Sequence, residues 1–191
     1  YDCYAEALKI AESLENPDRH AAVLNKLGIV MREMREFDRA LAFFQEYLAK
    51  KQEDLISQGT ALNNIGMIHL DKAEFKEAKG VLERARSINE RSQNPQALSN
   101  TLGNMGLACY REGNLDEAIE YYHRSLEMSQ KREDASGYWK DLLNLGLAYS
   151  EKGELDTAFR YYTQAADVSQ GVGDVIGEKQ ALIHLAQCAK R

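Results

Sequence analysis

The chain has 191 residues, of which 44% are hydrophobic and 28% charged, and it carries a formal net charge of −6 at pH 7. This composition excludes an intrinsically disordered chain, and the acidic balance argues against general affinity for nucleic acid or anionic membranes, which both require a dominant basic face. No apolar run approaches the roughly 20 residues that span a bilayer, and no basic-then-apolar signal segment is recognisable. The three widely separated cysteines are typical of reduced thiols, so we expect a cytoplasmic protein.

Residues 1–15 match the second half of a repeat, so we expect them to form the second helix of a repeat that begins before Tyr1. A helix-start signal then recurs along the chain. One equivalent position is occupied by Asn16, Asp54, Asn94, Asp134 and Asp174. Asn and Asp are favoured N-caps, and proline follows two of them at the first helical position, where it is tolerated. The pattern predicts helices that begin near residues 17, 55, 95, 135 and 175.

Each of these helices opens one copy of a repeat. The third copy reads Leu102, Met105, Gly106, Cys109, then Gly113, Leu115, Ala118 and Tyr122, and the pattern returns at a spacing of 40 residues (38 before the second copy). Such periodicity is typical of a solenoid built from helical hairpins. The predicted segments are a second helix at 1–15, repeats at 16–53, 54–93, 94–133 and 134–173, and a first helix at 174–191.

A glycine recurs inside each first helix, at Gly28, Gly66, Gly106 and Gly146. Glycine costs about 0.5 to 1 kcal/mol against alanine inside a helix. We therefore predict close approach of the facing helix at these positions, through its recurring alanine, which is Ala118 in the third repeat.

The motif Leu142-x-x-Leu145-Gly146-x-x-Tyr149, followed by Ala158-x-x-x-Tyr162, resembles the tetratricopeptide repeat. The resemblance covers nearly the whole chain, although the period is about 40 residues against the usual 34 and leucine replaces the frequent first tryptophan. It implies an all-α, right-handed α-solenoid of antiparallel helix hairpins.

Within that family, the Asn-x-Gly steps at Asn64, Asn104 and Asn144 are similar to the long-repeat branch found in spindle-orientation adaptors, kinesin light chains and bacterial peptide-pheromone receptors. There, the resemblance implies, a ladder of asparagines on the concave surface holds the backbone of a partner peptide. In the outer repeats the same position is occupied by Lys26 and His184.

The residues themselves favour a peptide-binding groove on the face of the first helices opposite their core positions. This face mixes Asn with Met, Leu and Tyr, whereas an ordinary solvated face is mostly Lys and Glu. Amides both donate to and accept from a peptide backbone, and apolar neighbours form side-chain pockets. The predicted groove residues are Asn25, Lys26, Arg32, Asn63, Asn64, Met67, Asn100, Asn104, Leu107, Tyr110, Arg111, Lys140, Asn144, Leu147 and His184.

Basic residues outnumber acidic ones on this face, which favours a partner with acidic character. The alternative for the asparagines is that they only bridge neighbouring helices, and the alternative for Trp139, beside Lys140, is packing between hairpins rather than ligand contact. Three functions remain open: a peptide-binding module, a regulatory or sensor domain of a larger signalling protein, and a scaffold that self-associates through its end helices.

Neither catalysis nor a cofactor is expected. Cys3, Cys109 and Cys188 are widely separated and read as reduced core thiols, and the histidines have no metal-ligand spacing. The glycine-rich segment 171–177 precedes a helix but lacks the spacing and the preceding strand of a phosphate-binding loop, and Asp174 would repel phosphate.

Overall fold

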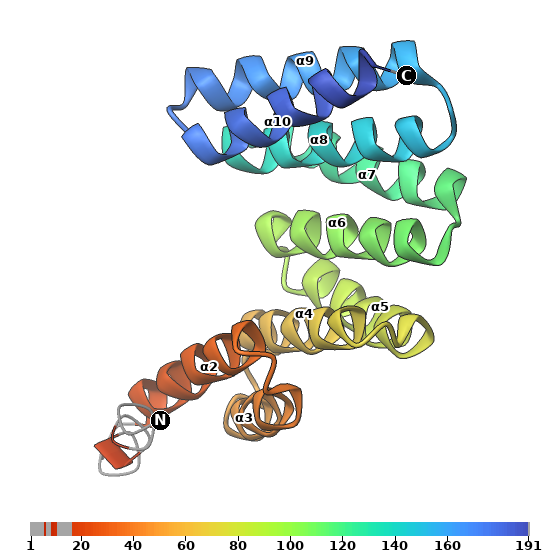
Figure 1. Cartoon of the computed structure of the whole chain (residues 1–191). Coiled ribbons are helices and arrows are strands. Elements are labelled where there is room, and N and C mark those ends of the chain that lie inside the picture. The colour runs from red at the N-terminus through yellow and green to blue at the C-terminus, as the bar shows by residue number, and fades with distance from the viewer. Residues whose placement is uncertain (1–5, 7–8, 11–16, 191) are drawn as a thin grey trace. The chain divides into compact units, whose positions relative to one another are not determined.

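The computed structural model describes residues 6, 9–10 and 17–190. The expected helix at 1–15, the N-cap Asn16 and Cys3 lie outside these residues. Within the part described, the secondary structure is helical and contains no strand (Figure 1). The all-α class predicted from the repeat pattern is confirmed.

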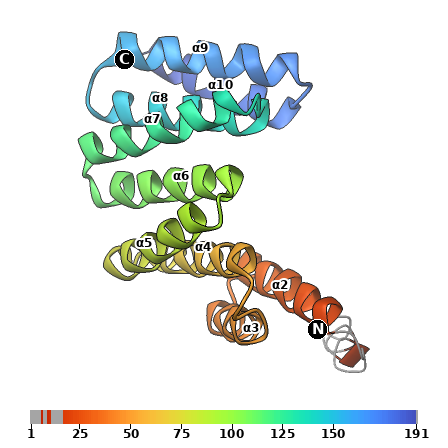
Figure 2. The ribbon, with the colours of Figure 1, turned by 180° about the vertical axis from the view of Figure 1, so that it is seen from behind.

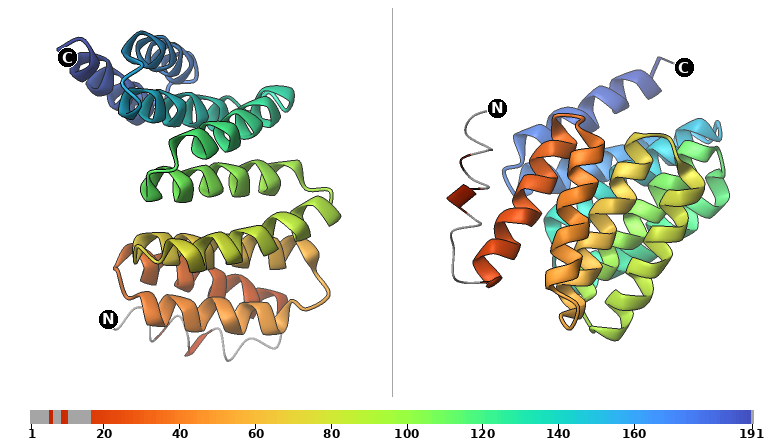
Figure 3. Two further views of the ribbon diagram at one scale, coloured as in Figure 1. Left: turned by 90° about the vertical axis from the view of Figure 1, so that its right-hand side faces the viewer. Right: turned by 90° about the horizontal axis from the view of Figure 1, so that it is seen from below.

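The chain divides into two compact units, residues 1–97 and 98–191. In the first unit, α2 and α3 form one hairpin, α4 and α5 form another, and α3 packs against α4. Figure 3 shows α2, α3 and α4 following one another as neighbours. The helix bounds are Pro17–Glu33 for α2, Phe37–Lys50 for α3, Leu55–Asp71 for α4 and Phe75–Arg91 for α5.

Helix α6 begins before the boundary and continues into the second unit, where α7, α8, α9 and α10 follow. Helix α8 packs against α7 and α9, and α10 packs against α9 and, over a smaller area, α8. Figures 1 and 2 show α8, α9 and α10 as neighbours from both sides. The bounds are Pro95–Glu112 for α6, Leu115–Lys131 for α7, Ala135–Glu151 for α8, Leu155–Gly171 for α9 and Val175–Cys188 for α10.

The predicted N-caps hold the first helix of each described repeat after the first. The Asp54 carboxylate accepts from the backbone N–H groups of Ile56 and Ser57, each at 3.1 Å. Asn94, Asp134 and Asp174 each accept one backbone N–H from three residues further on, at 3.0 to 3.1 Å. These bonds satisfy N–H groups that a helix start leaves unpaired, and they explain why α4, α6, α8 and α10 begin at the residue after the cap.

Among the helices that the structure describes, seven end in the same turn, in which one residue takes a positive φ. Glycine holds this position at Gly113, Gly153 and Gly173, but Ala73 occupies it between α4 and α5 with φ +59°. The following N–H then donates to the carbonyl five residues back, as from Glu74 to His69 at 2.9 Å. This bond is characteristic of the Schellman motif, and it reverses the chain so that the next helix can pack antiparallel.

The predicted close approach at the helix glycines is confirmed, but the predicted partner was wrong. A Cβ added to Gly106 would lie 2.6 Å from the Tyr122 ring, and one added to Gly146 would lie 2.5 Å from the Tyr162 ring. Phe44 and Leu82 fill the same place opposite Gly28 and Gly66.

The alanine of the facing helix packs elsewhere. Ala118 lies in a cluster with Cys109 of its own hairpin and with Leu145 and Ala148 of the next. The small residue therefore serves contact between successive hairpins, while the large residue four positions later fills the space above the glycine.

Candidate functional site

All fifteen predicted groove residues are half-buried or exposed, whereas the core positions of α4 and α8 are buried, as for Leu62 at 4% and Leu142 at 1%. They are distributed over both units. The first unit holds Asn25, Lys26 and Arg32 on α2 and Asn63, Asn64 and Met67 on α4; the second holds Asn100, Asn104, Leu107, Tyr110 and Arg111 on α6, Lys140, Asn144 and Leu147 on α8, and His184 on α10.

In the first unit, one amide of this face bridges two helices. The Asn64 side chain donates to Asn25 Oδ1 over a long 3.4 Å. An asparagine offers two donor hydrogens and an acceptor oxygen, so this single bond leaves further capacity. Arg32 Nε lies 3.4 Å from Asp71 Oδ2, so an acidic side chain on the same face already partly compensates this basic charge.

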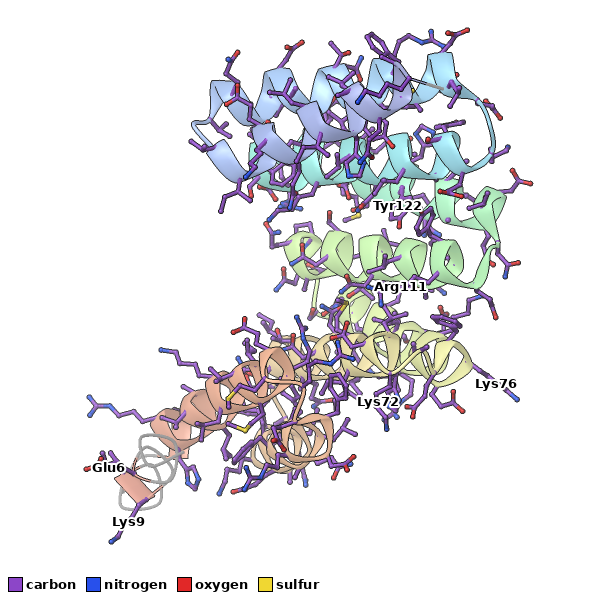
Figure 4. All side chains as sticks on the ribbon, in the orientation of Figure 1. Glu6, Lys9, Lys72, Lys76, Arg111 and Tyr122 are labelled. Carbon is purple, nitrogen blue, oxygen red and sulfur yellow. The ribbon has the colours of Figure 1, made fainter. Side chains whose placement is uncertain are left out.

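In the second unit, Asn144 is half-buried, and its side chain makes no hydrogen bond with the residues that the structure describes. Arg111 is exposed at the end of α6 (Figure 4). Lys140 is exposed, with its ammonium 5.5 Å from the centroid of the Trp139 ring. Trp139 itself is only 4% exposed and covers Gly177, where an added Cβ would lie 2.8 Å from the indole. Trp139 is thus a packing residue between α8 and α10.

A cleft of about 140 Å³ lies between α8 and α10 and brings two of the predicted residues together. Helix α8 contributes Leu147, Ser150 and Glu151, α9 contributes Tyr162, and α10 contributes His184, Gln187 and Cys188. The His184 and Tyr162 rings stack with their centroids 5.4 Å apart and an interplanar angle of 18°. The repeat pattern placed Leu147 and His184 on this face, but it did not indicate the enclosed space between them.

Glu151 influences the hydroxyl groups around this cleft. Burial raises the pKa of Tyr162 to about 12, a hydrogen bond with Ser150 opposes the shift, and the Glu151 charge adds to it. Burial and the same charge also raise the pKa of Tyr110 on α6. Both phenols therefore stay protonated at neutral pH and remain hydrogen-bond donors.

A second polar group is fully enclosed and was missed by the sequence reasoning. Asp141 of α8 accepts from the Ser125 and Ser129 hydroxyls of α7 at 3.1 and 3.0 Å, and Ser99 of α6 lies 3.2 Å from both serines. Burial raises the pKa of Asp141 to about 6 against the opposing effect of those two hydrogen bonds. The sequence did contain a signal for this group, because Asp141 places a carboxylate at the repeat position that Ala61 occupies two repeats earlier. The cluster joins three helices in the interior and does not line the cleft.

Comparison with protein families identifies the class of protein. Models described as tetratricopeptide repeat match residues 1–53 and 57–131, and another of the same description matches residues 142–176. The match covers more than half of the chain, which therefore belongs to the tetratricopeptide repeat family. Within the described residues, no helix combines the length and the apolar character needed to cross a membrane.

Solved structures share the fold at low sequence identity. Aspartyl phosphate phosphatase F from Bacillus subtilis superposes with a TM-score of 0.87 at 18% identity, over 95% of this chain and 48% of that one. A signal transduction ATPase with a tetratricopeptide repeat sensor from Pyrococcus horikoshii gives 0.80 at 16% identity, over 95% of this chain and 28% of that one. A Rap protein complexed with Competence and Sporulation Factor gives 0.79 at 15% identity, over 95% and 51%.

This chain thus spans about half the length of the first of these proteins. Comparison with curated protein sequences found no match.

Proposed function

We propose that the chain is a non-catalytic protein-interaction module that holds a peptide segment of a partner on the amide-bearing face of its first helices. The carrying observation is Asn144, whose half-buried amide has no hydrogen bond within the described residues and lies one turn from the apolar Leu147. The complex of a Rap protein with Competence and Sporulation Factor supports the proposal, because that protein has the same fold.

The chemistry of such binding follows from the amide group. A peptide backbone presents alternating donors and acceptors, and an asparagine satisfies both with one side chain. Each such bond contributes only about 0.5 to 1.5 kcal/mol, so several are needed in succession. In the second unit, Asn104 and Asn144 recur at 40-residue spacing, as in the long-repeat branch of the family, and His184 occupies the same position in the next repeat. In the first unit, Asn64 occupies this position. Apolar side chains beside the ladder then select the partner.

The partner's charge is a separate part of this proposal. Lys26 on α2 of the first unit and Lys140 on α8 of the second are both exposed, and each favours an acidic residue in a segment bound beside it. Arg32 contributes less to this preference, because Asp71 already lies beside it. Cys109 and Cys188 are buried and form no disulfide with the described residues, which suits a reducing cytoplasmic environment.

A peptide-display selection on the folded protein tests this function. We expect enriched peptides to lose about 10-fold in affinity for Asn144→Ala, equivalent to about 1.4 kcal/mol, and more for Asn104→Ala combined with Asn144→Ala. Gln164→Ala removes an exposed amide from α9 and is the matched control. Failure to enrich any peptide, or equal affinity for all variants, would contradict the proposal.

A sensor role is a second candidate, favoured by the likeness to the ATPase that carries a tetratricopeptide repeat sensor. A sensor transmits binding to distant elements, whereas a passive module does not. Hydrogen exchange with and without a selected peptide distinguishes them: a sensor shows altered protection in helices that do not contact the peptide, and a passive module shows changes at the contact alone.

Self-association through α10 is a third candidate, favoured by its exposed apolar residues. Val175 is 72% exposed and Ile176 is 71% exposed. Light scattering over a wide concentration range tests it, with Ile176→Glu as the variant that should abolish any dimer. A wild-type protein that stays monomeric at the highest concentration would rule it out.

A further inference from the structure

We propose that the cleft between α8 and α10 receives the lysine or arginine side chain of a bound peptide and pairs its positive charge with Glu151. This inference rests on the proposed peptide-binding function and specifies the chemistry of one position in the bound segment.

The size of the cleft indicates what it holds. Its volume of about 140 Å³ lies well below the roughly 300 to 1,000 Å³ of pockets that enclose small molecules or cofactors. It therefore suits one side chain of a peptide whose backbone lies outside, on the amide-bearing face. Leu147 and His184 belong both to that face and to the cleft, so the two are continuous.

The charge in the cleft favours a cation. No lysine or arginine is among the lining residues, and Glu151 is the only carboxylate there. Glu151 makes no ion pair with the residues that the structure describes. Its neighbour Lys152 is directed elsewhere, with its ammonium 2.7 Å from Asp116 and 3.3 Å from Glu154. An entering cation thus meets an uncompensated carboxylate, whereas an acidic side chain is repelled.

The remaining groups complete a site for a long basic side chain. The oxygens of Ser150 and Gln187 can accept hydrogen bonds from an ammonium or guanidinium group. The half-buried His184 ring, stacked on the buried Tyr162 ring, lines the cleft, and arginine stacks well on such planar groups. Leu147 can cover the methylene stem of the entering side chain, as apolar surface commonly does for lysine and arginine.

The first test uses blocked amino acids and needs no identified partner. NMR titration with N-acetyl-arginine amide and N-acetyl-lysine amide should shift the side-chain signals of His184 and Gln187, while N-acetyl-glutamate amide should not. Glu151→Gln should weaken this binding at least fivefold, and added salt should weaken it in the wild type. Glu120→Gln removes an exposed carboxylate from α7 and should change nothing. Equal binding of the arginine and glutamate probes would overturn the proposal.

The second test separates this inference from the proposed function. Peptides selected against the wild type should carry a basic residue at one position. Replacing that residue by alanine should lower the affinity for the wild-type protein as much as Glu151→Gln lowers the affinity for the unchanged peptide. Peptides that depend on Asn144 but are indifferent to Glu151→Gln would refute the cleft assignment alone. Arginine binding in the cleft without any Asn144-dependent peptide would instead refute the proposed function.

Discussion

Helices α8 and α10 occupy the same position in successive repeats, 40 residues apart, yet their apolar residues differ sharply in burial. Leu142 is 1% exposed and its counterpart Leu182 is 51% exposed, and Leu143 at 8% contrasts with Ile183 at 45%. Helix α8 packs against both α7 and α9, but α10 packs mainly against α9. The comparison teaches that a residue at a given repeat position is buried when its helix is packed between two neighbouring helices, as α8 is. The residue type at that position does not determine burial.

The glycine position shows the same difference. Gly146 of α8 lies under the Tyr162 ring, where even one methyl group would come within 2.5 Å of it. The counterpart in α10 is Ala186, which is exposed. Glycine is thus needed where a large side chain of the second helix presses on the first helix, and alanine is tolerated where none of the described residues does so.

The largest effect on stability is expected from truncating Leu142, and Leu182 is its matched comparison. Leu142→Ala should destabilise the fold by about 3 to 5 kcal/mol because it leaves a cavity in a closed core, while Leu182→Ala should cost less than about 1 kcal/mol. Urea denaturation of both variants measures the difference. Equal losses would show that the α10 face is covered in solution.

The second prediction concerns Asp141, which is buried in α8 where α10 has the buried Ala181. Burial raises its pKa from the ordinary 3.8 to about 6 in the folded protein. The folded state therefore holds the proton more tightly, and this stabilisation is present below pH 4 and lost as the pH rises to 6. Asp141→Asn, which does not titrate, should gain up to about 3 kcal/mol over wild type between pH 4 and pH 7. Parallel stability curves for the two proteins would contradict the burial of a titrating carboxyl.

Smaller effects are expected at the glycine position. Gly146→Ala should destabilise by about 1 to 3 kcal/mol, because the new methyl group displaces the Tyr162 ring in a closed core. Ala186→Leu, on the uncovered helix, should stay within about 0.5 kcal/mol. Thermal unfolding of both variants measures the difference between the two stability losses. No difference is expected if Gly146 is needed only for backbone flexibility.

The smallest effect is expected in the turn that brings α9 onto α8. Gly153 has φ +81° there, and Ala73 has φ +59° in the equivalent turn of the first unit. Gly153→Ala should cost about 1 kcal/mol, and Ala73→Gly should stabilise by about 0.5 kcal/mol, because the left-handed region penalises a Cβ. The denaturation midpoint should therefore fall for Gly153→Ala and rise for Ala73→Gly. Shifts in the same direction would contradict the turn geometry.

Local signals in the sequence predicted the features that local chemistry decides. Asp54 and Asp134 predicted helix starts because the side chain of an N-cap accepts a hydrogen bond from the first turn of its own helix. Periodic apolar residues predicted which face of each helix is apolar, since a helix places them on one face whatever its neighbours. Family membership followed from the same repeated positions.

Features that depend on how helices cross could not be predicted in this way. Tyr122, rather than Ala118, lies over Gly106, because side-chain direction and the crossing of two helices select the partner. The bond from Ser129 to Asp141 joins residues of different helices, and no repeat pattern encodes it. The cleft beside Glu151 likewise depends on how α10 lies against α8.

Contact between the asparagine ladder and a peptide is tested most directly by NMR on the side-chain amide of Asn144. Saturation with a peptide selected against the wild type should shift the Asn144 side-chain signals strongly and leave those of Gln164 on α9 unchanged. An Asn144 signal that stays in place under saturating peptide would contradict binding through this face.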